Sequence, residues 1–217
     1  MNHPATKLKR ADIAPLTTRV LHRGRGFQSS VFLVEIEGQV AAVKDYADTP
    51  KWFRTFVAPL LLRRESRALR ALDGVSCVPR FYGRPDSHSM AMQFLPGTPL
   101  DTFALGELAP EVFPRVQAAI DAIHARHVSH CDLKRRSNLL LSPDGEIYLI
   151  DFAAAVVGGK TFAPFSNRLQ KQMALIDDKS VPRLKKFVAP ELLTDEDRAK
   201  LNNPTPLEKW AKKLLGR

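Results

Sequence analysis

Cysteine is scarce in this sequence of 217 residues, and long apolar runs are absent. The two cysteines, Cys77 and Cys131, lie far apart without the spacing of a metal site, which favours a reducing compartment over a disulfide framework. No stretch approaches the roughly 18 consecutive apolar residues that a membrane-spanning helix needs, and no apolar signal region follows the basic N-terminus. We therefore expect a soluble, cytoplasmic protein, with a peripheral contact to the inner membrane left open.

Acidic residues are outnumbered, since 33 lysines and arginines stand against 23 aspartates and glutamates, which gives a net charge of +10. This balance favours anionic partners: a nucleotide, nucleic acid, phosphorylated sugars or an acidic membrane surface. Internal repeats and low-complexity segments are also missing from the sequence. The length fits one compact unit, or a unit of two lobes, with a sizeable core.

The stretch 130–151, HCDLKRRSNLLLSPDGEIYLID, holds the residues around which we expect the site to form. Two short apolar runs, 139–141 and 147–150, flank a cluster of turn-forming residues, and this pattern predicts a β-hairpin. Asn138 opens the first strand and Asp151 ends the second, so the hairpin brings both to one end. An amide oxygen and a carboxylate are hard ligands suited to Mg²⁺, which takes further oxygens from substrate phosphates.

At these residues the chain resembles the protein-kinase-like superfamily, whose catalytic loop reads H-R-D-L-x-x-x-N and is followed by D-F-G. Here the loop reads HCDLKRRSN and is followed by DFA. The 13 residues from Asn138 to Asp151 match the hairpin of that family, whereas Asp132 to Asn138 is one residue longer, the extra residue lying within 134–137. An isolated H-x-D would fit a surface loop, but the loop, the hairpin and the DF pair together favour the kinase-like interpretation.

The resemblance implies an α+β fold of two lobes. It implies an N-terminal extension at 1–15, a β-rich N-lobe at 16–95 and a reduced, mainly α-helical C-lobe at 96–217. It also implies ATP as cofactor in the cleft between the lobes, together with Mg²⁺. Because the chain is short for a full kinase domain, peripheral helices of the C-lobe are expected to be missing.

The resemblance also gives roles to four residues of the stretch. Asn138 and Asp151 are expected to hold Mg²⁺ across the phosphates, and Asp132 to orient and partly deprotonate the acceptor hydroxyl. Lys134 is expected to neutralise charge on the γ-phosphoryl group during its transfer.

Residues 16–46 alternate apolar and polar positions in a way that predicts three strands. Gly24 and Gly26 resemble the glycine-rich loop whose N–H groups approach the phosphates, although G-x-G alone also fits an ordinary hairpin turn. Lys44 ends a V-A-A-V-K run similar to the family's V-A-I-K strand, on one face with Ala42. The resemblance makes Lys44 a ligand of the α- and β-phosphates and Ala42 the roof of the adenine. The alternative for Lys44 is a surface lysine.

The run LLLRRESRALRAL repeats apolar residues with helical spacing. One stripe of this helix consists of Leu61, Ala68, Leu69 and Leu72. Glu65 falls on the same stripe, and a carboxylate that faces a core needs a cation. Lys44 is the expected partner, as in the Lys–Glu pair of active kinases. The alternative places Glu65 at a rim, paired with Arg64 or with solvent.

A strand that ends at Leu95 resembles the hinge of the family. Backbone groups of Gln93 and Leu95 are then expected to bond the adenine edge, and Met92 to border the pocket. Beyond the hinge, apolar spacing predicts a buried helix within 110–126.

Features on either side of the hairpin bear on regulation and support. Cys131 replaces the arginine that receives an activation-loop phosphate in kinases with H-R-D, so switching by such phosphorylation is not expected.

Asp178, which follows a helical segment at 167–176, is expected to brace the catalytic loop from behind. Residues 204–217 have an apolar and a basic face, and we expect them to close the C-lobe, with an anionic membrane interface as the alternative.

The function expected from the resemblance is serine/threonine protein kinase activity with Mg-ATP as phosphate donor. With its small size, degenerate motifs and missing peripheral helices, the chain resembles atypical RIO-like bacterial protein kinases. The D-L-K sequence and the NLLL hairpin favour serine/threonine protein kinases. A lipopolysaccharide core-sugar kinase is the alternative, because small size and a basic surface suit it equally. A catalytically weak ATP-binding regulator and a nucleic-acid-associated scaffold are further alternatives, against which Asp132 argues, because a pure binder does not need it.

Overall fold

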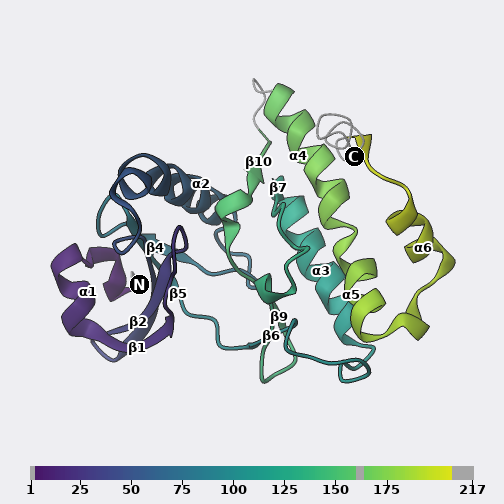
Figure 1. Ribbon diagram of the computed structural model, residues 1–217, viewed down its shortest axis with the longest axis horizontal. Helices are drawn as coiled ribbons and strands as arrows, with labels where there is room; N and C mark the ends of the chain where they lie inside the picture. The colour runs from purple at the N-terminus through teal and green to yellow at the C-terminus, as the bar shows by residue number, and fades with distance from the viewer. Residues whose placement is uncertain (1–2, 160–163, 207–217) are drawn as a thin grey trace. The chain divides into compact units, whose positions relative to one another are not determined.

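The computed structural model describes residues 3–159 and 164–206 (Figure 1). Contacts along the chain divide it into two compact units, Met1–Leu95 and Pro96–Arg217. The N-terminal unit is rich in β-strands, whereas the C-terminal unit is mainly helical.

The N-terminal unit is built on a five-stranded antiparallel sheet with the order β1-β2-β3-β5-β4. Its strands are β1 (Thr17–His22), β2 (Ser30–Ile36), β3 (Gln39–Asp45), β4 (Phe81–Gly83) and β5 (Ser89–Gln93). The three strands predicted within 16–46 are therefore confirmed. Strand β3 is central, since Lys44 pairs with Val31 on one side and with Met90 on the other.

The N-terminal segment belongs to the core of this unit. A 3₁₀ turn, η1 (Pro4–Lys7), and helix α1 (Arg10–Leu16) bring Ala5, Leu8 and Ile13 into one apolar cluster. Their partners in the sheet are Val34, Ala41, Val43 and Ala91. Because side chains alternate along a strand, this cluster occupies the face of β3 opposite to Lys44 and Ala42.

A helical segment follows β3. It contains a π-helical turn, η2 (Phe53–Val57), and continues as α2 (Ala58–Ala71). The buried stripe of α2 is headed by Leu62, which is fully buried, whereas the predicted Leu61 is only half-buried. Leu62, Glu65, Leu69 and Leu72 are spaced by three and four residues, so they share one helical face. The predicted stripe is thus correct from Glu65 onward and one residue out at its start.

The C-terminal unit packs helices against two small sheets. One sheet has the order β6-β8-β9, and the other pairs β7 with β10. The strands are β6 (Thr98–Pro99), β7 (Val128–Ser129), β8 (Leu139–Leu141), β9 (Ile147–Leu149) and β10 (Val156–Val157). The helices are α3 (Val112–Ala125), α4 (Pro164–Asp177), α5 (Ser180–Val188) and α6 (Asp195–Asn202). Short 3₁₀ turns are η3 (Arg136–Asn138), η4 (Phe152–Ala154) and η5 (Pro190–Leu192).

The predicted helix within 110–126 and the predicted hairpin are both present. Helix α3 buries Val116, Ile120 and Ile123 completely, as its apolar spacing predicted. In the hairpin, β8 and β9 are antiparallel with Leu139 opposite Leu149. Helix α3 and strand β9 are in contact, so α3 supports the strand that leads to Asp151.

Within the ranges 3–159 and 164–206, no helix is both long enough and apolar enough to cross a membrane. The amphipathic helix predicted for 204–217 falls almost entirely on residues 207–217, which lie outside the described residues.

Candidate active site

Lys44 and Glu65 form a buried ion pair in the N-terminal unit. The Lys44 Nζ lies 2.8 Å from the Glu65 Oε2, and their side chains are 7% and 1% exposed. Strand β3 supplies the lysine, and the buried stripe of α2 supplies the glutamate. The pairing expected from the stripe is therefore present, and the surface alternatives for both residues are wrong.

The glycine-rich loop between β1 and β2 uses its two predicted glycines for different reasons. A Cβ atom on Gly24 would lie 2.1 Å from the carbonyl oxygen of Gln28, so the close backbone approach excludes any larger residue. Gly26 has a φ of +63°, which side chains disfavour. The N–H of Gly24 donates to the Ser30 Oγ at 3.1 Å, which ties the loop to the start of β2.

The predicted adenine-contacting residues lie around β3 and β5. Ala42 is 5% exposed and is the cross-strand neighbour of Met92, so these two predicted neighbours of the adenine meet in the sheet. The N–H of Gln93 donates to the carbonyl oxygen of Arg80 at 2.8 Å, which holds the end of β5. Leu95 follows as a buried residue at the boundary of the unit.

The catalytic loop of the C-terminal unit links Asp132 to Asn138 through the backbone. The Asn138 Nδ2 donates to the carbonyl oxygen of Asp132 at 3.0 Å, so the amide oxygen of Asn138 is turned away from that bond. The N–H of Ile150 donates to the Asn138 carbonyl oxygen at 3.0 Å, which closes the open end of the hairpin just before Asp151. Asn138 and the start of the Asp151 segment are therefore brought together, as the hairpin pattern predicted.

Asp151 has a left-handed backbone, with φ of 66° and ψ of 70°. A residue with a side chain seldom adopts this region, and it persists only where the surroundings impose it. Here the constraint comes from β9 on one side and from the buried Phe152 of η4 on the other. The chain therefore changes direction at Asp151, between β9 and η4.

Arg135 is a neighbour of Asp132 that the sequence interpretation did not include. Its Nε lies 3.2 Å from the Asp132 Oδ2, and its side chain is 65% exposed. An ion pair this exposed is screened by solvent and contributes little, about 0–1 kcal/mol. The spacing of three residues was the only sequence signal for it. Lys134 is exposed on the same loop.

The residue that braces the catalytic loop is Asp177, so the prediction of Asp178 is wrong by one position. The carboxylate of Asp177 is fully buried and accepts from the N–H of His130 at 2.6 Å and from the N–H of Cys131 at 2.8 Å. Its Oδ2 also lies 3.3 Å from the His124 ring. Asp178 is partly exposed, and burial raises the pKa of its carboxyl, which the nearby His124 partly offsets.

His130 anchors the other side of the loop. Its buried ring lies 2.9 Å from the carbonyl oxygen of Ile150 through Nε2 and packs against the Phe152 ring, with centroids 4.5 Å apart. Because a carbonyl oxygen only accepts, Nε2 carries the proton. Burial lowers the pKa of the imidazole, so the ring is neutral and structural at neutral pH.

The donor set fits a hard cation that brings its own oxygen ligands. No group of three or more His, Cys, Asp or Glu side chains able to hold a metal occurs in the part of the chain that the structure describes. Asn138 and Asp151 would supply one amide and one carboxylate oxygen, and Mg²⁺ completes such a shell with water and phosphate oxygens. The oriented amide oxygen of Asn138 is consistent with that use.

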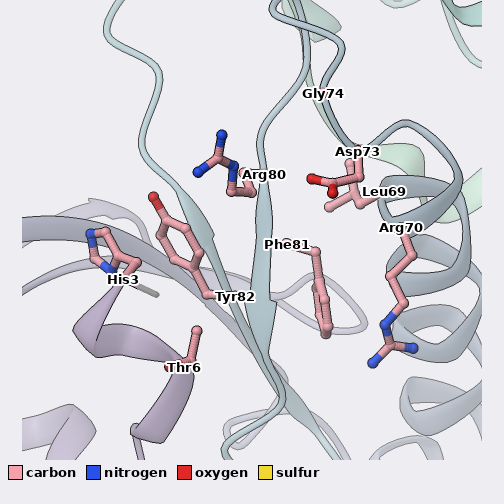
Figure 2. A pocket seen from close by; sticks show the side chains of 9 residues that line it. All are labelled: His3, Thr6, Leu69, Arg70, Asp73, Gly74, Arg80, Phe81 and Tyr82. Atoms are coloured by element: carbon pink, nitrogen blue, oxygen red, sulfur yellow. The ribbon is translucent and has the colours of Figure 1, made fainter. Parts of the chain in front are cut away.

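A pocket of about 690 Å³ also lies in the N-terminal unit (Figure 2). Its aromatic wall comprises Phe81, over which the Arg70 guanidinium lies at 4.4 Å, and Tyr82, whose ring stacks on His3 at 4.0 Å. The lining is completed by Thr6, Leu69, Asp73, Gly74 and Arg80. None of the predicted nucleotide-binding residues lines this pocket, so it is separate from the candidate site.

Comparison of structures identifies the class of fold. The Rio2 kinase from Chaetomium thermophilum is similar to this chain with a TM-score of 0.60 and 17% sequence identity, covering 94% of this chain and 65% of that one. The chain therefore has a protein-kinase-like, α+β fold of two lobes, with a β-rich N-terminal part and a mainly helical C-terminal part, as predicted.

Sequence comparisons are consistent with this class. The serine/threonine-protein kinase PknH of Mycobacterium bovis and of Mycobacterium tuberculosis is 31% identical over 142 residues, which is 61% of this chain and 23% and 22% of those proteins. The probable SapB synthase of Streptomyces coelicolor is 31% identical over 115 residues, 43% of this chain and 12% of that protein. The alignments thus span less than a quarter of these relatives. No protein-family model matches the chain.

The Lys44→Met substitution should lower the free energy of unfolding by about 3–5 kcal/mol, because it leaves the buried Glu65 carboxylate without its cation. The double variant Lys44→Met/Glu65→Leu should recover most of this loss, since two apolar side chains then pack together. Urea unfolding followed by circular dichroism measures both. A single variant as stable as the wild type would contradict the buried pair.

The Asp177→Ala substitution should lower the free energy of unfolding by about 3 kcal/mol or more, because two buried N–H groups lose their acceptor. The neighbouring Asp178→Ala is the matched control and should change it by about 1 kcal/mol or less. Thermal and urea unfolding of the two variants, side by side, decide between the positions. Equal losses would restore the prediction of Asp178.

His130 makes stability depend on pH. Since its folded pKa is lowered, the unfolded chain binds a proton near the ordinary value of 6.5 that the folded chain does not bind, so stability falls as the pH decreases through that value. From pH 7.5 to pH 5.5 the wild type should therefore lose more unfolding free energy than His130→Phe, which has no imidazole at this position. The exposed His22→Phe is the control, and an unchanged difference for His130→Phe would refute a neutral, buried ring.

Proposed function

We propose that this chain is an ATP-dependent phosphotransferase that moves the γ-phosphoryl group of Mg-ATP to a hydroxyl group. The observation that carries the proposal is the catalytic loop, where Asp177 fixes the backbone and Asn138 bonds the carbonyl of Asp132. The buried Lys44–Glu65 pair supports it independently in the N-terminal unit. A nucleotide-binding regulator without catalysis would need neither a held Asp132 nor its brace.

On the donor side, Lys44 would contact the α- and β-phosphates, with its ammonium held in place by Glu65. The backbone of the loop at Gly24 and Gly26, where neither residue carries a side chain, would approach the phosphates. The adenine-facing residues would be Ala42, Met92, Gln93 and Leu95. Bound Mg²⁺, held by Asn138 and Asp151, would neutralise charge on the phosphate oxygens.

On the acceptor side, Asp132 would accept a hydrogen bond from the acceptor hydroxyl and take its proton as the hydroxyl oxygen bonds to the γ-phosphorus. The bond from that phosphorus to the β-phosphate oxygen breaks at the same time, and ADP leaves. Its exposed pair with Arg135 is weak, so the carboxylate can exchange that partner for the hydroxyl. Lys134, exposed on the same loop, would offset charge on the γ-phosphoryl group. Catalysis of this kind consists of positioning and electrostatic stabilisation.

For the acceptor we propose a serine or threonine hydroxyl of a protein, which is the acceptor class named for the PknH relatives. The test is a screen with γ-³²P-labelled ATP and Mg²⁺ over three acceptor sets: mixed proteins, lipopolysaccharide and small alcohols including aminoglycosides. Label in protein that is stable to acid and labile to base supports the proposal. Label confined to lipopolysaccharide would show that the acceptor is a core sugar and not a protein. If no label reaches any of the three acceptor sets and no ATP is hydrolysed, the proposed phosphotransferase activity is contradicted.

The Asp132→Asn substitution should lower kcat by about 10²–10⁴, because it removes the base that acts on the acceptor in the transition state. The Kd for Mg-ATP should change by less than about threefold, since Asp132 is not expected to touch the nucleotide. Asp144→Asn, an exposed carboxylate in the hairpin turn, is the control and should keep wild-type values. Steady-state kinetics and calorimetric ATP binding measure both quantities. Loss of ATP binding in a folded Asp132→Asn variant would contradict the assigned role.

A further inference from the structure

The helical segment at 51–71, which includes α2, exposes large apolar side chains on its outer side. Trp52 is 56% exposed, Phe56 is 70% exposed and Leu60 is 64% exposed. Their spacing of four residues places them along one side of the helix. The opposite side of α2 carries the buried stripe with Glu65. The segment therefore has apolar residues on its exposed side as well as on its buried side. Surface residues without a function seldom produce such a row.

A fourth exposed apolar side chain extends the row. Phe27, at the tip of the glycine-rich loop, is 54% exposed, and its ring centroid lies 5.5 Å from that of Trp52 and 5.0 Å from that of Phe53. We call Phe27, Trp52, Phe56 and Leu60 the apolar row. Its members come from two separate stretches of one unit and together present aromatic rings and a leucine to solvent.

Within residues 51–71 the exposed charges have one sign. Exposed cations of the same helical segment are Lys51, Arg63, Arg64, Arg67 and Arg70. The single carboxylate of residues 51–71 is Glu65, which is 1% exposed and paired with Lys44, so it does not offset these cations at the surface. The loop that carries Phe27 adds the exposed Arg23 and Arg25. The face is therefore apolar at its centre and cationic around it.

We propose that this face docks on the surface of an anionic lipid bilayer. Aromatic side chains, tryptophan above all, are favoured at the level of the lipid headgroups, where one edge of the ring is wet and the body is apolar. Arginine and lysine beside them meet the phosphates of anionic lipids, and their apolar stems can follow the interface. An amphipathic helical face with rings at its centre and cations around it has the composition of an interfacial membrane contact.

The alternative occupants fit the charge pattern less well. A second copy of this chain would oppose cations to cations, because the whole chain carries a charge of +10. The C-terminal segment 207–217 is itself basic, with three lysines and an arginine against one glutamate, so it would meet the same repulsion. Only an anionic surface satisfies the apolar row and its cations at once.

The experiment is vesicle co-sedimentation of the full-length protein without nucleotide. Binding to vesicles of phosphatidylcholine with 30 mol% phosphatidylglycerol, on the order of a typical anionic fraction, should exceed binding to pure phosphatidylcholine by about tenfold and should fall as NaCl is raised. Phe56→Ser/Leu60→Ser should weaken binding about tenfold or more. Leu105→Ser, a 67% exposed leucine of the other unit, is the matched control and should bind as wild type.

Two further variants test the cations and the reporter. The Arg63→Gln/Arg67→Gln variant should bind anionic vesicles several-fold more weakly at low salt, because it loses about two interfacial cations. The Arg126→Gln/Lys186→Gln variant makes the same charge change in the other unit and should bind as the wild type does. Only two tryptophans are present, so Trp210→Phe leaves Trp52 as the single reporter, and its fluorescence should shift to the blue on anionic vesicles.

The proposal is overturned by any of three results. Equal binding of the Phe56→Ser/Leu60→Ser variant and wild type would show that another face binds lipid. A concentration-dependent dimer lost in that variant, without vesicle binding, would assign the face to a second copy. Vesicle binding that appears only after residues 207–217 are deleted would show that in the intact chain this segment, and not lipid, occupies the face. Since no ATP is used, none of these results depends on the proposed phosphotransfer.

Discussion

The carboxylate of Asp177 is the contact on which the catalytic loop depends. It is fully buried, and it holds two consecutive N–H groups, those of His130 and Cys131, at 2.6 and 2.8 Å. Cys131 has a φ of 69°, a conformation that a side chain disfavours, and the two charge-assisted hydrogen bonds offset that cost. The next residue is Asp132, so the direction in which its carboxylate leaves the chain is set by a helix that begins more than 30 positions later.

Further hydrogen bonds extend this constraint to the hairpin. The Asp132 carbonyl accepts from the side chain of Asn138, and the Asn138 carbonyl accepts from the N–H of Ile150. His130 returns to the carbonyl of the same Ile150. Hydrogen bonds to backbone carbonyls thus set the spacing of Asp132, Asn138 and the residue before Asp151. This rigidity fits a site that is formed constitutively, and the Cys131 thiol, directed at the Ser129 carbonyl at 3.4 Å, offers no cation for a regulatory phosphate.

In the N-terminal unit, a buried ion pair holds Lys44 in position. Lys44 points to one face of β3, and the apolar residues of η1 and α1 cover the other face. The charge of Lys44 is balanced by Glu65 from α2, so removing either partner leaves a buried charge whose cost exceeds the gain from most apolar contacts. This pair positions the strand relative to the helix, and it is a contact that the hydrophobic pattern alone does not require.

Periodicity predicted the elements, but not the contacts that one residue of register decides. The hairpin, the three strands and helix α3 follow from apolar spacing and turn residues. The Lys44–Glu65 pair follows from the stripe of α2 together with the resemblance to active kinases. The prediction is one residue out at Leu61, where Leu62 is the buried residue, and at Asp178, where Asp177 braces the loop. Neighbouring helical residues differ by about 100° in direction, and only packing selects between them. Arg135 gave no signal beyond its spacing. The role of residues 4–16 in the core was missed because a 3₁₀ turn and a seven-residue helix are too short to show periodicity.

The central claim is that Asn138 and Asp151 hold Mg²⁺ against the phosphates of a nucleotide, and the dependence of ATP affinity on Mg²⁺ tests it most directly. Calorimetric titration of ATP with and without Mg²⁺, in wild type and in Asp151→Asn, gives the four Kd values required. We expect Mg²⁺ to strengthen ATP binding about tenfold or more in the wild type and to have little effect in Asp151→Asn. Equal affinities with and without Mg²⁺ in the wild-type protein would contradict the account.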